Sequence, residues 1–139
     1  MDLGTARKIL DTALAHAVEH KFMPMAIAVF DARGALKAFV AQDGTSLKRG
    51  EIAMGKAQGA LAMGLGTRAL MKRAETQPYF IAAATAAIGG TLIPVPGGVL
   101  IKSGGKVIGA IGLSGDTSDN DEAAAFAAIA AAGLEADGG

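Results

Sequence analysis

The sequence predicts a single α/β domain over residues 1–139, of the α+β type, in which helices pack on a central, mostly antiparallel sheet. Two pairs of short apolar runs are each joined by a glycine-containing turn, as in β-hairpins. Segments with helical apolar spacing lie before, between and after these pairs. A chain of 139 residues is also long enough to bury a core without covalent cross-links.

In the first half, apolar residues recur at intervals of three and four over Leu3–Lys21, which predicts a helix. The runs Met25–Phe30 and Ala35–Val40 flank a turn of Asp, Ala, Arg and Gly, which predicts a hairpin. Ser46 or a nearby residue can then cap a second predicted helix, which continues to about Met63. The expected order so far is helix, two strands, helix.

In the second half, a short helix is expected over Thr67–Ala74, and Pro78 suits the first turn of another that ends at a Gly-Gly pair. Val99–Lys102 and Lys106–Leu113 flank a second Gly-Gly turn and form the second predicted hairpin. A last helix is expected over Ala123–Ala132, preceded by acidic residues that favour a helix N-terminus. No domain boundary or repeat interrupts this order.

Composition excludes several classes of partner and site. There is no cysteine, so disulfides and thiolate metal sites are excluded. Thirteen basic and thirteen acidic residues cancel, so neither nucleic acid nor an anionic membrane surface is an expected partner. Proline and glycine interrupt the uncharged stretch Thr76–Ile101, which argues against a membrane span. The N-terminus lacks the pattern of a secretory signal, so a cytoplasmic location is expected.

The chain is rich in small residues, with 31 alanines and 20 glycines. Such side chains bury little apolar area each, so an isolated monomer is expected to be marginally stable. The predicted last helix is apolar on all sides, including Phe126, and would leave an exposed patch on a monomer. We therefore expect a homo-oligomer.

The two histidines, His16 and His20, lie four residues apart on the first predicted helix, so their side chains share one face. Helical geometry places both toward one flank of the apolar stripe, with His20 nearer its centre. This placement suits a haem ligand, with His20 the first candidate for the iron. The alternative is a pair of half-exposed helix histidines without a ligand. Met23 is the nearest sulfur that could replace them.

Charged residues supply further candidates. Lys56 shares a helical face with alanines. Its amine can be desolvated there, in which case it binds a carboxylate or acts as a base. Alternatively, the side chain extends past the short alanines and the amine reaches water. Arg68 and Arg73 are candidate anion ligands, or else solvated surface. Four carboxylates precede or begin the last helix: Asp116, Asp119, Asp121 and Glu122. Helix-end charge explains them, and Asp116 and Asp121 are also weak catalytic candidates.

Several short motifs, in this order along nearly the whole chain, resemble the GlcG/HbpS family of small haem-binding proteins. They are Pro24–Asp31, Asp43-Gly44, Ile52–Ala57, Pro96–Val99, Val107–Gly115 and Asn120–Glu122. The resemblance implies an α/β sandwich with a central antiparallel sheet, an assembly of several subunits, and haem or another tetrapyrrole as ligand. Members also include proteins encoded beside catabolic operons and the C-terminal half of some corrinoid adenosyltransferases.

Three hypotheses follow. The first is a cytoplasmic, oligomeric, haem-binding or haem-handling protein, with His20 or His16 as axial ligand, Lys56 near a propionate and Arg68 as a further cofactor contact. The second is a cofactor-free isomerase or hydratase that acts on a small organic acid of a catabolic pathway, through Lys56 with Asp116 or Asp121. The third is a non-catalytic structural or partner protein.

Overall fold

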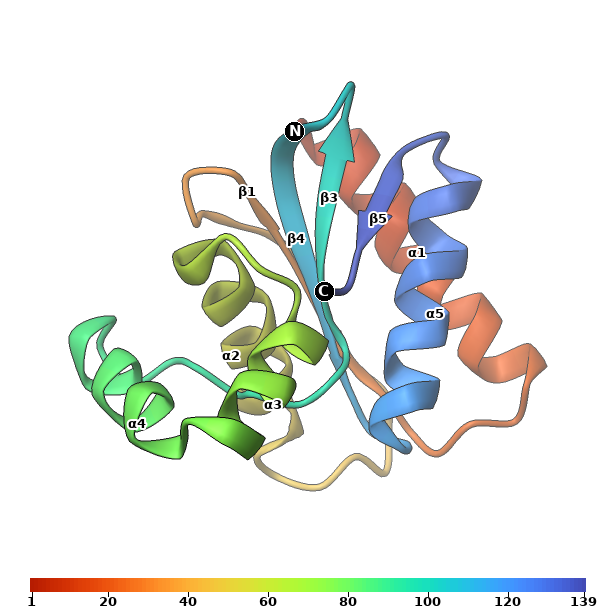
Figure 1. Cartoon of the computed structure of the whole chain (residues 1–139). Helices are drawn as coiled ribbons and strands as arrows, with labels where there is room; N and C mark the ends of the chain where they lie inside the picture. Colours follow the sequence, from red (N-terminus) through yellow and green to blue (C-terminus); the bar gives the residue numbers. More distant parts are fainter.

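A five-stranded antiparallel sheet organises the chain in the computed structural model, which describes residues 1–139. Its strands lie in the order β2-β1-β4-β3-β5 (Figure 1). The elements in chain order are α1 (Leu3–Glu19), β1 (Ala26–Asp31), β2 (Leu36–Ala41), α2 (Arg49–Met63), α3 (Thr67–Thr76), α4 (Pro78–Ala87), β3 (Gly98–Ser103), β4 (Lys106–Ser114), α5 (Ser118–Ala131) and β5 (Glu135–Asp137). The predicted fold class and both predicted hairpins are confirmed.

The two hairpins join through their inner strands. β1 pairs with β4 from Ala26 opposite Ser114 to Asp31 opposite Gly109, so the sheet is continuous across the hairpins. Strand β1 is buried at every position, because it has a strand on each side and helices over each face. The pairing also brings the end of β4 beside the segment that enters β1, and this is where the functional candidates gather.

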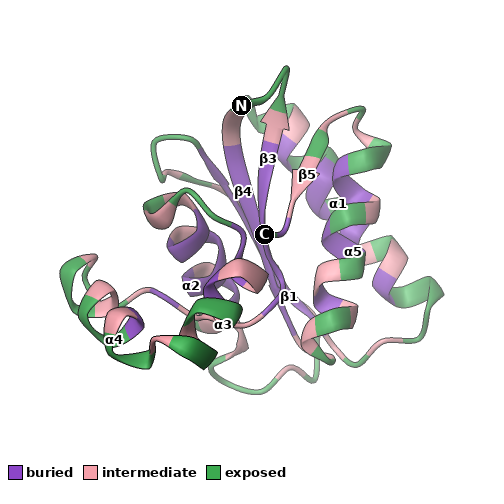
Figure 2. Cartoon of the chain, viewed as in Figure 1, coloured by how far each residue is buried: buried purple, intermediate pink, exposed green.

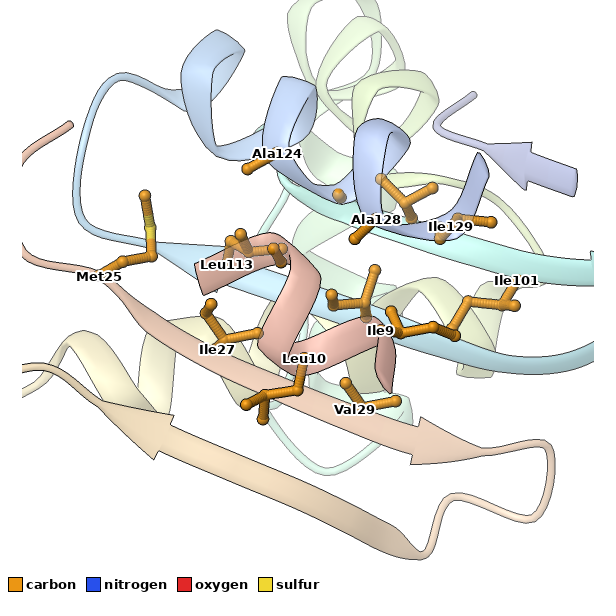
Figure 3. Packing of buried hydrophobic residues seen from close by; sticks show 14 of the residues in the cluster. Ile9, Leu10, Met25, Ile27, Val29, Ile101, Leu113, Ala124, Ala128 and Ile129 are labelled. Atoms are coloured by element: carbon orange, nitrogen blue, oxygen red, sulfur yellow. The ribbon is translucent and has the colours of Figure 1, made fainter. Parts of the chain in front are cut away.

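Helices cover both faces of the sheet. α1 and α5 pack together on one face, and α2 packs on the other (Figure 1). Side chains alternate along the strands, so that Ile27 and Leu113 face α1 and α5 whereas Ala28 and Ala110 face α2. Figure 3 shows the larger of these two clusters, in which aliphatic side chains of the strands meet alanines and isoleucines of the two helices. The core is therefore divided into two layers by the sheet.

The layer between α2 and the sheet depends on small residues. Gly112 of β4 lies against α2 so closely that a Cβ atom there would be 1.9 Å from the carbonyl oxygen of Ala53. At Gly98 of β3, a Cβ would be 2.5 Å from the carbonyl oxygen of Lys56. Backbone thus packs on backbone, which accounts for glycine at these two positions and holds Lys56 deep in the molecule.

The α3 and α4 helices form a separate lobe beside α2. Helix α4 contacts no element other than α3 (Figure 1). Ile81 is its only buried residue, and Figure 2 shows most of the helix as exposed or intermediate. None of the helices is long and apolar enough to cross a membrane.

Sequence reasoning missed β5 and misplaced some helix ends. β5 has only three residues, too few for an alternating pattern, and it pairs with β3 at the sheet edge. α5 begins at Ser118 rather than Ala123, because the Thr117 hydroxyl accepts a hydrogen bond from the Asn120 amide at 3.2 Å and caps the helix earlier. α2 begins at Arg49 with no side-chain cap, so the predicted capping by Ser46 or a neighbour is wrong, and α1 ends at Glu19 rather than near Lys21.

The packing of α2 on β4 predicts the effect of one methyl group. Gly112→Ala should lower the free energy of unfolding by about 3 kcal/mol or more, because the clash is with helix backbone that cannot rotate away. Gly4→Ala is the matched control, since a Cβ at Gly4 meets only the Asp2 carboxylate at 3.7 Å. Urea unfolding followed by circular dichroism measures both. Equal midpoints for the two variants would contradict this packing.

Candidate functional site

The C-terminal end of α1 brings the two histidines together. The imidazole rings of His16 and His20 stack with their centroids 3.9 Å apart and an angle of 20° between planes. The ring of Phe22 lies 5.9 Å from His16 and 5.7 Å from His20, so three aromatic rings form one cluster. The sequence prediction that both histidines share one face is confirmed.

A local backbone reversal builds this cluster. Lys21 adopts the left-handed conformation with φ 57°, and the Phe22 amide donates to the carbonyl of Ala17 at 2.9 Å. The Lys21 amide donates to the carbonyl of Val18 at 3.1 Å. This arrangement ends the helix and directs the chain back along it, which places Phe22 against the histidines.

One hydrogen bond determines which nitrogen of His20 is available. Nδ1 of His20 lies 2.8 Å from the carbonyl oxygen of His16. A carbonyl oxygen only accepts, so Nδ1 carries the proton and donates. In the neutral ring, Nε2 then keeps its lone pair, and no protein group hydrogen bonds to it. A histidine whose other nitrogen donates to a backbone carbonyl is the usual form of a metal ligand.

The relative burial of the two histidines is opposite to the prediction. His16 is half-buried. Its pKa is lowered, mainly by burial and to a smaller extent by the neighbouring His20. His20 is exposed, so the expectation that it lies nearer the centre of the apolar stripe is wrong. The helix ends at Glu19, one residue before it, and the regular helical rotation no longer applies. Met23, which follows Phe22 in the chain, is 63% exposed.

Lys56 lies in the interior rather than at a ligand-binding surface. Its Nζ donates to Oδ2 of Asp121 at 2.9 Å and to the carbonyl oxygen of Leu113 at 2.8 Å, and both side chains of the ion pair are only 2% exposed. Gly97 closes over the amine, since a Cβ there would lie 2.8 Å from Nζ. The Lys56 amine is therefore not exposed for the expected propionate contact, because α2 packs its small-residue face directly on β3 and β4.

Burial has the largest effect on the pKa values of Lys56 and Asp121. It lowers the pKa of Lys56 and raises the pKa of Asp121, while their mutual attraction acts in the opposite direction on each. The interpretation of Asp121 as a helix-end charge was incomplete, because its carboxylate is the partner of a buried amine. Neither residue lines any of the four surface cavities, so the pair is closed off from solvent.

Asp116 connects the ion pair to the histidine cluster. Its carboxylate accepts hydrogen bonds from the Met23 amide at 2.7 Å, the Thr117 amide at 2.8 Å and Nδ2 of Asn120 at 2.6 Å. These bonds lower the pKa of Asp116, the Met23 amide most strongly. Its own amide donates to Oδ1 of Asp121 at 3.1 Å. Asp116 is thus a structural anchor for the loop that enters β1.

The two arginines singled out from the sequence are engaged by protein groups. Arg68 donates to Asp119 at 2.5 Å and to Glu122 at 2.7 and 2.9 Å, and these carboxylates raise its pKa. Arg73 covers the ring of Phe80 at 4.0 Å. Neither arginine lines a cavity, so their expected roles as anion ligands have no support in the structure.

Two of the surface cavities are lined in part by residues of α2. One, of about 320 Å³, lies between α2 and the segment at Gly90–Ile93 and contains no histidine. The other, of about 170 Å³, has Arg49 in its wall together with Met23. Sequence reasoning missed Arg49. The available signal was an arginine three residues after the pair Thr45-Ser46, at the start of a predicted helix.

The buried ion pair predicts a specific pattern of stability. Lys56→Met should lower the free energy of unfolding by about 3–5 kcal/mol, because Asp121 is left buried without a cation. Adding Asp121→Asn should recover at least half of that loss, since the charge is removed while an oxygen remains for the Asp116 amide. Urea denaturation measures this double-mutant cycle. Additive losses in the double variant would contradict the pairing.

Comparison with known proteins gives a consistent family and fold. Residues 1–130 match the family model described as haem degrading protein HbpS-like. PduOC, crystallised as a complex with haem, has a TM-score of 0.87 at 24% identity over 97% of this chain and 96% of that one. ORFY of Klebsiella pneumoniae gives 0.86 at 22% identity, over 96% and 90% of the two chains.

HbpS itself has a TM-score of 0.81 at 26% identity, over 94% of this chain and 89% of that one. No curated protein has a sequence that matches this chain. The family model covers nearly the whole chain and agrees with the motifs found in the sequence. The chain therefore belongs to the HbpS-like family of haem-degrading proteins.

Proposed function

We propose that this chain binds haem, with Nε2 of His20 as the axial ligand of the iron. The observation that carries the proposal is the Nδ1 hydrogen bond of His20 to the carbonyl of His16, which leaves Nε2 free to ligate. Membership of the HbpS-like family supports haem as the ligand. So does the relative PduOC, which was crystallised as a complex with haem.

The residues around His20 suit a flat apolar ring system. Phe22 presents its ring beside the imidazoles, and Met23, the next residue in the chain, is largely exposed. Haem when bound supplies an iron with axial positions open to a ligand such as imidazole. The stacked rings lie side by side and cannot reach opposite sides of one iron, so only one of them ligates. His16 then orients His20 through its carbonyl and its ring.

Location and assembly complete the proposal. We place the protein in the cytoplasm, where a chain without cysteine needs no disulfide. We also expect self-association, because α5 buries only one side against α1 and the sheet. Its other side leaves Phe126 40% exposed among exposed alanines, and α4 adds further uncovered apolar surface.

The enzyme hypothesis has less support, because Lys56 and Asp121 are closed off from solvent.

Haemin titration tests the ligand assignment. The parent should give a saturable Soret band, and His20→Ala should abolish or shift it because Nε2 is lost. His16→Ala should change the band less, since the backbone carbonyl that orients His20 remains. Lys8→Ala, on the exposed surface of the same helix, is the control and should match the parent. Identical spectra for all four proteins would contradict histidine ligation, and a residual band in His20→Ala would point to Met23.

Light scattering behind a sizing column tests self-association at micromolar concentration. The parent should be a dimer or larger, and Phe126→Glu should shift it toward monomer because a charge would be buried in the contact. Ala32→Glu, in the exposed turn between β1 and β2, adds the same charge away from α5 and should leave the mass unchanged. A monodisperse parent monomer would refute the assembly.

A further inference from the structure

Three loops converge on the cavity of about 170 Å³ at the end of the sheet where β4 stops and β1 begins. Its wall contains residues from the loop before β1, from the loop between β2 and α2, and from the end of β4. These residues are Met23, Pro24, Gly44, Thr45, Ser46, Arg49 and Gly115. Figure 1 shows these loops together at the lower end of the sheet, near the start of α5.

Arg49 is the only cation in this wall, and it has no carboxylate partner. One guanidinium nitrogen donates to the Ser114 hydroxyl at 3.2 Å, and no other protein group accepts from Arg49. A guanidinium has five N–H donors, so most of them are unused in a half-buried side chain. By contrast, Arg33 and Arg68 each pair with acidic residues.

No acidic side chain lines this cavity, and Asp43 is exposed outside its wall. Asp121 is buried against Lys56, and Asp116 accepts three hydrogen bonds from the protein. Hydroxyl groups add to the donors around Arg49, because the Ser46 side chain is unpaired and the Thr45 hydroxyl bonds only to the Gln42 carbonyl. The cavity therefore offers a cation and hydroxyl groups without a competing anion of its own.

The walls are fixed by close backbone contacts rather than by mobile side chains. A Cβ at Gly115 would lie 2.3 Å from the carbonyl oxygen of Pro24, so only glycine allows these two loops to meet. Gly44 has φ +88°, a conformation that favours glycine, and it lies against the ring of Pro24. Such a preformed site lowers the entropic cost of binding a small group.

We propose that this cavity binds a carboxylate group, with Arg49 as its cationic ligand. A planar guanidinium suits a carboxylate through two parallel hydrogen bonds. At roughly 30 Å³ for each water molecule, 170 Å³ holds about five waters, enough for a carboxylate on a short chain but not for a macrocycle. The carboxylate has two possible sources. A propionate of a haem held at His20 is the first, and this source rests on the proposed function. A free small acid is the second, and it is independent of the proposed function.

The first source is sterically reasonable because the cavity and the histidine cluster share a boundary. Met23 lines the cavity and directly follows Phe22, whose ring contacts both imidazoles. Its backbone is held by Asp116, so this boundary is fixed. A flat ligand on His20 would extend over Met23 toward Arg49. This assignment replaces Lys56, which is sealed in the core, as the propionate ligand.

Two titrations on the full chain test the proposal and separate the sources. The first adds sodium propionate without haem and follows the Arg49 side-chain Nε–H resonance by NMR, assigned with Arg49→Gln. The second measures haemin affinity of the parent, Arg49→Gln, Arg49→Lys and Lys48→Gln. Lys48→Gln is the matched control, because it removes the neighbouring positive charge, which pairs with Glu51 outside this cavity.

A saturable propionate shift of Arg49 that Lys48→Gln leaves intact supports binding of a free acid. Haemin affinity about tenfold weaker in Arg49→Gln, with an unchanged histidine-ligated spectrum and with Lys48→Gln like the parent, supports a haem propionate. Arg49→Lys should lie between, since it keeps the charge but not the paired donors. If haemin does not bind but propionate shifts Arg49, the proposed function fails and this inference stands. No response of Arg49 in either titration overturns it.

Discussion

The buried ion pair between Lys56 and Asp121 is the constraint on which this end of the molecule depends. It joins α2 to α5 through the middle of the fold, and its third contact, the carbonyl of Leu113, adds the end of β4. A buried amine that lost this carboxylate would remain desolvated and uncompensated. Close glycine contacts at Gly97 and Gly112 make the pairing possible, because they let the helix and the strands approach backbone to backbone.

From that pair, hydrogen bonds lead outward to the proposed site. Asp121 accepts from the Asp116 amide, and Asp116 in turn accepts from the amide of Met23. Met23 separates the aromatic cluster that contains His20 from the cavity that contains Arg49. The proposed iron ligand and the proposed carboxylate ligand are therefore held by one continuous framework. Lys56 supports the proposed site from the core, where its amine is paired with Asp121 and inaccessible.

The helices and strands could be predicted from the sequence more accurately than the contacts between distant side chains. Apolar periodicity and turn residues were sufficient for the two hairpins and for the helices, since both are local properties. The sequence hypothesis combined Lys56 with Asp116 or Asp121 in a catalytic role, but a buried ion pair with Asp121 could not be predicted, because Asp121 lies 65 residues away and is also explained as a helix-end charge. His20 was misplaced because the helix ends one residue before it. Arg49 was missed because its cavity exists only where three distant loops meet.

The central claim is that a hydrogen bond within one turn of α1 prepares His20 to hold the iron of haem. A crystal structure of the chain loaded with haemin tests it most directly. The account predicts iron bonded to Nε2 of His20, with Nδ1 still donating to the carbonyl of His16 and the macrocycle over Phe22 and Met23. Haem bound on the α2 side of the sheet, or iron without a histidine ligand, would contradict it.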